Sequence, residues 1–248
     1  MLTVGHNFIS FSIFEKFPEL LCVMSTRVAG DLYIKNPRQP VKMQSFLNQL
    51  AIRTDELVSM EQVHGSEVVI VNRTNKNDRI ILAVDSLVTQ SPGLFLGVNV
   101  ADCVPVFLYD PVKKIVGVVH AGWRGTEQGI VANSINQLIK LGVDKHSLLV
   151  AIGPHIGGCC YEVSADFAQS FKTKFPSDRV VFQTQNKWHV DLGEANKLSL
   201  LELGVLPEHI DVPITCTSCQ NARYFSFRKD SKATFGEMLG MIGIRQKV

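Results

Sequence analysis

Short apolar runs, separated by turn residues, set the pattern of this chain. Four of them, at 94–100, 106–109, 115–120 and 148–152, are nearly continuous in apolar residues, as buried strands are. A short connection with an Asp-Pro turn joins the second run to the third, which predicts an antiparallel hairpin or adjacent strands. Shorter runs predict further extended segments at 21–27, 68–71, 210–215 and 224–228.

Helical periodicity alternates with these runs. Apolar positions recur at helical spacing in 41–52 and in 126–141, where Gly142 supplies a stop. Shorter helices are expected at 164–171 and 193–203. Strands and helices alternate without a regular βαβ rhythm. The pattern therefore predicts a mixed α/β or α+β fold, one domain over 1–248 with mixed buried β-sheets flanked by helices.

Composition narrows the class of protein. The chain has 248 residues, of which 46% are hydrophobic and 19% charged, so it can bury a sizeable core. A net charge of +2 without a dense basic run does not favour nucleic acid as a partner. No signal peptide or membrane-spanning run is recognisable, so a cytoplasmic protein without membrane partners is expected. Dinucleotide and Walker-type phosphate motifs are not found.

Three polar residues stand near the ends of apolar segments and suggest a metal site. His64, Cys103 and His120 offer two imidazoles and one thiolate, a familiar ligand set for zinc. Three protein ligands leave a fourth position open for water or substrate, as catalytic zinc requires. The alternative is three unrelated residues, with Cys103 as a core thiol and His64 in a loop. Our central hypothesis is that the three residues meet and bind one metal ion.

Several neighbours of these residues could support catalysis. Asp102 could orient a ligand histidine, or it could simply accept hydrogen bonds from backbone N–H groups at a strand end. Arg124 carries a fork of donors suited to phosphate, and its alternative is a surface salt bridge. Glycines on both sides would let the backbone approach an anion. Arg27, Arg228 and Lys229 are further basic candidates whose default is solvent exposure.

The remaining cysteines allow other chemistry. Cys216 and Cys219 have the C-x-x-C spacing of half a zinc site or a redox pair, but no second such motif accompanies them. His155 with Cys159 and Cys160 could form a Cys–His hydrolase site at the end of a glycine-rich loop. The alternative for this loop is a turn with buried thiols. The roles of these four cysteines stay open.

A set of motifs, taken in order, resembles a known family. They are Gln62–Gly65, Asp85–Thr89, Ala101–Val106, His120–Gly125, Ile152–Pro154 with Cys160–Val163, and Cys216-Thr217 with Phe225–Arg228. The chain resembles, over roughly residues 55–240, the purine nucleoside phosphorylase family formerly called multicopper polyphenol oxidase (laccase-like). That family includes the bacterial peptidoglycan editing factors. The H-A-G-W-R-G and A-D-C blocks are the most specific part of the match.

The resemblance implies a cytoplasmic enzyme with Zn2+ held by the catalytic residues His64, Cys103 and His120. It implies phosphorolysis of adenosine, inosine, guanosine and methylthioadenosine, with adenosine deamination as a second activity. Arg124, first of all, and then Asp102 and Arg27 are expected to contact substrate or phosphate.

Other functions remain alternatives. They are a cysteine hydrolase or peptidoglycan-precursor editing enzyme, and a non-enzymatic binding module. Polyphenol oxidation is disfavoured because several coppers need many histidines and the chain has only 7. The preferred nucleoside and the oligomeric state stay open.

The chain departs from the family pattern at two places. Arg27 is followed by Val-Ala-Gly-Asp, where the family usually has Gly-Gly-Val-Ser after its arginine, which leaves the role of Arg27 open. Glu237 stands between Gly236 and Met238, where the family usually has Gly-Arg-Met. The absence of that arginine predicts a weaker contact with an anion.

Overall fold

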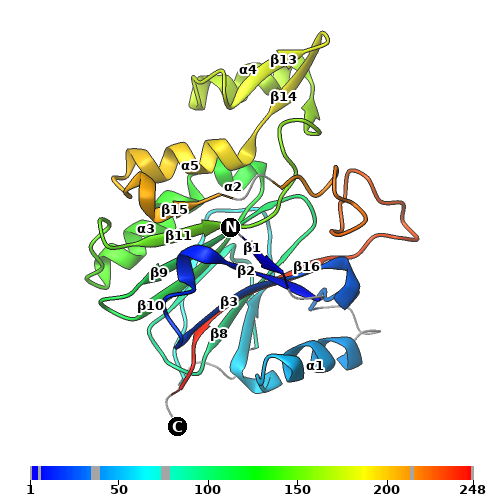
Figure 1. Cartoon of the computed structure of the whole chain (residues 1–248). Helices are drawn as coiled ribbons and strands as arrows, with labels where there is room; N and C mark the ends of the chain where they lie inside the picture. The colour runs from blue at the N-terminus through cyan, green and yellow to red at the C-terminus, as the bar shows by residue number, and fades with distance from the viewer. Residues whose placement is uncertain (1, 5–6, 35–39, 74–78, 213–214, 247–248) are drawn as a thin grey trace.

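Two β-sheets packed face to face form the centre of the molecule (Figure 1). The computed structural model describes residues 2–4, 7–34, 40–73, 79–212 and 215–246. The seven-stranded sheet has the order β1 (Leu2–Val4), β2 (Phe8–Phe11), β3 (Leu20–Ser25), β16 (Met238–Ile244), β8 (Phe95–Val100), β4 (Leu57–Met60) and β6 (Ile80–Ile81). The six-stranded sheet has the order β15 (Ile210–Asp211), β11 (Leu149–Ile152), β9 (Val104–Asp110), β10 (Ile115–Ala121), β7 (Ser86–Thr89) and β5 (Val68–Ile70).

Helices cover the outer faces of both sheets. Helix α1 (Pro40–Gln49) packs on the seven-stranded sheet, while α2 (Trp123–Glu127), α3 (Ile130–Lys140) and α5 (Leu192–Glu202) lie on the other side (Figure 1). A three-stranded sheet projects beyond them with α4; its strands are β12 (Glu162–Val163), β14 (Lys187–Val190) and β13 (Val181–Thr184), and α4 spans Ala165–Lys174. Short 3-10 turns are η1 (Ser12–Phe14), η2 (Arg27–Ala29), η3 (Thr54–Glu56) and η4 (Pro207–His209). None of the described helices has the length and apolarity to cross a membrane.

The continuous apolar runs follow from burial on both faces of each sheet. On β9, Phe107 and Tyr109 pack between the two sheets, while Val106 and Leu108 pack toward the helices. Strand β10 alternates in the same way. Strands covered on both sides need apolar residues at every position, rather than the alternation of a half-exposed strand. The mixed α+β fold is therefore confirmed, as is the antiparallel pairing of β9 with β10.

Three elements differ from the expectations. The helix expected over 126–141 is interrupted at Gly129, whose φ of 79° separates α2 from α3. The strand expected at 224–228 is wrong, because Ser226 and Arg228 direct their backbone N–H groups to carboxylates within a series of turns. The extended segment at 210–215 is observed only as β15, and 213–214 lie outside the described residues.

Strand β16 was not expected from the pattern, yet it lies between β3 and β8 in the seven-stranded sheet. The sequence pattern did not predict this strand because it contains glycines, which are unfavourable in the interior of a strand. Gly240 is required by packing: a Cβ there would lie 2.7 Å from the Phe107 ring, which reaches across from the other sheet.

Candidate metal centre and its cavity

His64, Cys103 and His120 come together at one edge of the two sheets. One ligand atom from each lies within 4.8 Å of the others. The distance from Cys103 Sγ to His64 Nε2 is 3.8 Å, and the two imidazole centroids are 4.8 Å apart. A tetrahedral zinc with usual bond lengths places a sulfur and a nitrogen ligand about 3.5 Å apart. The three donors therefore fit one small cation with little movement.

Strand ends bring these residues together. His64 follows β4, and Cys103 lies where the chain passes from β8 in one sheet to β9 in the other. His120 is the second-last residue of β10. Two backbone positions there are left-handed, His64 with φ of 60° and Asp102 with φ of 87°. Such φ values are uncommon outside glycine and mark tightly constrained loops. The constrained loops therefore fix the directions of the His64 and Cys103 side chains, and strand β10 fixes that of His120.

Asp85 is the carboxylate that orients this cluster; it begins the Asp85–Thr89 motif but was not among the expected site residues. It is fully buried and accepts a hydrogen bond from His120 Nδ1 at 2.7 Å. It also accepts from the backbone N–H groups of Val63, His64 and Gly65 at 3.2, 3.0 and 2.7 Å. Donation from Nδ1 leaves His120 Nε2 free to face the cluster. One signal was present: a lone acid inside the apolar segment 80–88.

The charges of these groups depend on one another. Burial opposes ionisation of Cys103, but the charge and hydrogen bonds of His120, then those of His64, lower the pKa of the thiol to about 6. Burial likewise opposes protonation of His120, but the Cys103 thiolate and Asp85 raise the pKa of its imidazole to about 10. Burial also disfavours the charged form of Asp85, and its hydrogen bonds with His120 and Gly65 outweigh this and lower its pKa. The site therefore favours a thiolate, the form that binds metals.

Gly122 permits the close approach of these side chains. A Cβ at this position would lie 2.7 Å from His64 Cδ2 and 3.3 Å from Cys103 Sγ. Gly125, on α2, is similarly close to the backbone of Gly65. Gly122 therefore makes room for two of the candidate ligands and Gly125 for the loop that carries His64, while their expected role beside an anion stays a prediction.

The cluster opens into a cavity of about 690 Å³. Arg124 stands at its rim, exposed, with its guanidinium 4.2 Å from the Trp123 ring, and no hydrogen bond engages that guanidinium among the described residues. Phe227, 75% exposed, also lines the cavity. Glu237 lies in the wall too, where burial and then Asp31 raise the pKa of its carboxyl to about 7. The cavity thus offers an unpaired cation, aromatic faces and a proton-binding group.

Asp102 and Arg228 shape the cavity wall. The Asp102 carboxylate accepts hydrogen bonds from Thr217 Oγ1 at 2.6 Å, Ser226 Oγ at 3.0 Å and the Arg228 backbone N–H at 2.7 Å. Its described partners are loop groups and include none of the three metal-ligand candidates. The Arg228 guanidinium donates to the carbonyl of Glu162 at 3.1 Å. Asp102 therefore fixes the loops around Cys103 rather than orienting a histidine.

Arg27 does not line the cavity. Its guanidinium forms a salt bridge with Asp230 at 2.6 Å and lies 4.2 Å from the Phe225 ring. It also donates to the carbonyls of Asn221 and Tyr224 at 2.8 and 3.0 Å. These contacts give Arg27 a structural task, fastening η2 to the segment that carries the cavity wall.

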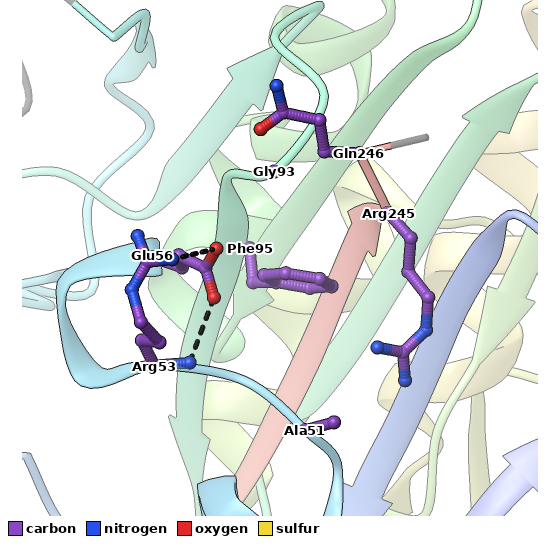
Figure 2. A pocket seen from close by; sticks show the side chains of 7 residues that line it. All are labelled: Ala51, Arg53, Glu56, Gly93, Phe95, Arg245 and Gln246. Atoms are coloured by element: carbon purple, nitrogen blue, oxygen red, sulfur yellow. Dashed lines mark hydrogen bonds and ion pairs between the residues drawn. The ribbon is translucent and has the colours of Figure 1, made fainter. Parts of the chain in front are cut away.

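A second hollow of about 470 Å³ lies at the other end of β8 and β16 (Figure 2). Figure 2 shows Arg53 joined to Glu56 there, with Arg245 across the hollow. The Arg245 guanidinium donates to the Leu50 carbonyl at 2.9 Å. Its arginines are thus occupied, and none of the cysteines or described histidines lines it.

Four of the other cysteines also form a cluster. Sulfur atoms of Cys159, Cys160, Cys216 and Cys219 lie within 4.8 Å of one another. His155 is buried and donates from Nδ1 to the Gly153 carbonyl at 2.8 Å. No described hydrogen bond joins His155 to a cysteine side chain, so these contacts do not favour a Cys–His hydrolase at this loop.

The fold and site define an α+β protein with a candidate His–Cys–His metal centre in a cavity. Residues 38–245 match the family model described as multi-copper polyphenol oxidoreductase laccase, and the chain belongs to this family. The resemblance inferred from the motifs is therefore confirmed.

Named relatives are enzymes of purine nucleoside metabolism. Purine nucleoside phosphorylase YlmD of Geobacillus stearothermophilus is 36% identical, covering 80% of this chain and 76% of the relative. Adenosine deaminase RL5, from an unknown prokaryotic organism, is 33% identical, covering 73% and 72%. Mouse purine nucleoside phosphorylase LACC1 is 31% identical, covering 80% of this chain but only 46% of that protein. A crystal structure of G. stearothermophilus YlmD superposes with a TM-score of 0.88 at 30% identity, covering 98% of both chains.

Proposed function

We propose that this protein is a zinc-dependent purine nucleoside phosphorylase with adenosine deaminase as a second activity. It acts on adenosine, inosine, guanosine and methylthioadenosine in a reducing, cytoplasmic setting. The observation that carries the proposal is the convergence of His64, Cys103 and His120 at a cavity lined by Arg124, whose guanidinium has no hydrogen bond among the described residues. The relatives named purine nucleoside phosphorylase and adenosine deaminase support the choice of substrates.

The donor set suits zinc. Two imidazole nitrogens and one thiolate match its borderline softness, and a fourth position stays open toward the cavity. When bound there, zinc supplies a Lewis acid that polarises or activates an oxygen. Asp85 holds the Nδ1–H of His120, so that Nε2 presents its lone pair to the metal position.

Phosphorolysis needs an anion site beside a site for the purine. A phosphate oxygen forms a bond to the C1′ carbon of the ribose as the glycosidic bond breaks, and the purine leaves with the electron pair and takes up a proton. We assign phosphate binding to Arg124, because its guanidinium is exposed, lies over the Trp123 ring and has no hydrogen bond among the described residues. Phe227 offers an exposed ring for stacking the base. Glu237, with a pKa of about 7, is suited to share a proton with the purine.

The direct test is phosphate-dependent release of hypoxanthine from inosine, together with conversion of adenosine to inosine. Cys103→Ala and His120→Ala should abolish activity together with the zinc held by His64, Cys103 and His120. Cys22→Ala is the matched control, since Cys22 is a buried thiol in β3 that does not line the cavity. Activity that is absent from the wild type, or unchanged in Cys103→Ala, would overturn the proposal.

One observation favours a second candidate, a cysteine hydrolase. Cys103, His120 and Asp85 also have the order of thiolate, imidazole and orienting carboxylate. The two candidates differ in the reactivity of Cys103. A zinc-bound thiolate resists alkylation until a chelator is added, whereas a free catalytic thiolate reacts at once.

A further inference from the structure

We propose that Cys159, Cys160, Cys216 and Cys219 bind a second metal ion, a zinc-class cation held by four thiolates. This four-cysteine cluster lies outside the cavity and shares no residue with the candidate metal centre. It joins two loops, one after β11 and one after β15.

The sulfur separations fit a shared ion. Cys219 Sγ lies 3.4 Å from Cys160 Sγ and 3.6 Å from Cys159 Sγ, and the sulfurs of Cys159 and Cys160 are 3.9 Å apart. Four sulfurs around a tetrahedral zinc, each at the usual bond length, are about 3.8 Å from one another. A disulfide would bring its two sulfurs to about 2 Å, far closer than any of these separations. Near-equal spacing of several sulfurs is therefore the geometry of a metal site.

The backbone holds the two halves of the cluster side by side. His155 and Cys216 form a parallel bridge, in which Thr217 donates its N–H to the His155 carbonyl at 2.9 Å. On one loop, Cys160 donates its N–H to the Gly157 carbonyl at 2.9 Å. On the other, Gln220 donates to the Cys216 carbonyl at 3.0 Å. The sulfurs therefore converge because both loops turn at the same place.

Gly157 leaves the space that the sulfurs occupy. A Cβ at Gly157 would lie 3.3 Å from Cys159 Sγ and 3.7 Å from Cys216 Sγ. A larger residue would press on the side chains of Cys159 and Cys216. The C-x-x-C pair lacked a second pair in the sequence, and the vicinal cysteines of the facing loop supply it in space.

The chemistry of the ligands selects the occupant. Four thiolates favour zinc or another soft ion and disfavour magnesium and calcium. All four positions are filled by protein, so the site is closed and structural rather than catalytic. Its task would be to clamp the loop that carries Thr217, which in turn hydrogen bonds to Asp102 beside Cys103.

The test measures metal in the full-length protein, purified under reducing conditions. Elemental analysis should find that Cys159→Ser/Cys219→Ser loses about one zinc per chain relative to the wild type, while Cys22→Ala loses none. Cys103→Ala should keep that zinc, so failure of the candidate metal centre and failure of the four-cysteine cluster are distinguishable. Unchanged zinc in the double variant would overturn the proposal.

X-ray absorption on Cys103→Ala keeps the test independent of whether the double variant folds. Four sulfur neighbours at about 2.3 Å from zinc are expected, and a shell of nitrogen and oxygen alone would refute the site. Mass spectrometry of the non-reduced wild type supplies the competing outcome. A disulfide from Cys219 to Cys159 or Cys160, with no zinc bound, would show that the cluster is a redox pair instead.

Discussion

Replacing Asp85 with Asn tests which carboxylate orients the metal ligands. The side chain keeps its size but loses its charge and one acceptor oxygen. In the wild type, each carboxylate oxygen of Asp85 accepts two hydrogen bonds. Oδ1 accepts from His64 N and His120 Nδ1, and Oδ2 accepts from Val63 N and Gly65 N. Whichever way the amide lies, its NH2 group faces two donors.

The magnitude follows from those bonds. Hydrogen bonds to a charged partner are worth about 1.5–3 kcal/mol each, so two lost bonds destabilise the fold by about 3–6 kcal/mol. If the NH2 group faces His120, the imidazole must accept at Nδ1, and the proton then sits on Nε2, where the metal should bind. Loss of such an outer hydrogen bond typically weakens metal affinity about 10–100-fold.

The matched control is Asp102→Asn. Asp102 is also buried and accepts three hydrogen bonds, none of them from His64, Cys103 or His120. We expect it to lower stability by a similar amount and to change zinc affinity by less than about threefold. Competition titration with a chromophoric chelator measures the affinity, and urea unfolding measures the stability. Equal losses of affinity in the two variants would refute the assignment of Asp85.

Three further predictions concern the cavity. Arg124→Lys should raise the KM for phosphate about 10-fold with a smaller change in kcat, because an ammonium cannot bind an oxyanion in a bidentate manner; an unchanged phosphate KM would contradict this role. Gly122→Ala should lose the zinc held by His64, Cys103 and His120 while remaining folded by circular dichroism, because its Cβ would meet His64 at 2.7 Å; a zinc content equal to that of the wild type would contradict that reading. In the metal-free protein, the pKa of Glu237 is raised from 4.5 to about 7, so the folded state holds the proton more tightly and stability should fall as pH rises from about 4.5 to about 7. This loss of unfolding free energy is at most about 3 kcal/mol. In urea unfolding at several pH values, Glu237→Gln should lack this pH dependence.

Sequence patterns located the candidate ligands because each follows from local rules. Apolar runs bounded by turn residues mark strand ends, and His64, Cys103 and His120 stand close to such ends. The rules do not say which ends meet. That depends on strand order, which places β4, β8 and β10 near one edge of two different sheets. The motifs of the family supplied this long-range information.

The sequence pattern did not predict the elements whose conformation is determined by packing and long-range hydrogen bonds. Strand β16 contains glycines where Phe107 and Phe95 press against the backbone, so its composition reflects the neighbours and not its own conformation. The segment 224–228 has alternating aromatics, as a strand would, but its buried polar groups bond to Asp102 and Asp230 instead of a neighbouring strand.

Asp85 and Asp102, two buried carboxylates, have separate roles, although the sequence suggested only Asp102 for orienting a ligand. Asp102 is next to Cys103 in the chain, and proximity alone made it the candidate for orienting a ligand. On this loop Asp102 has a φ of 87°, and its carboxylate is directed toward Thr217 and Ser226. Asp85 is remote in sequence but directly contacts a ligand nitrogen. Asp85 therefore sets which nitrogen of His120 is free, whereas Asp102 sets where the Cys103 loop lies, and neither can replace the other.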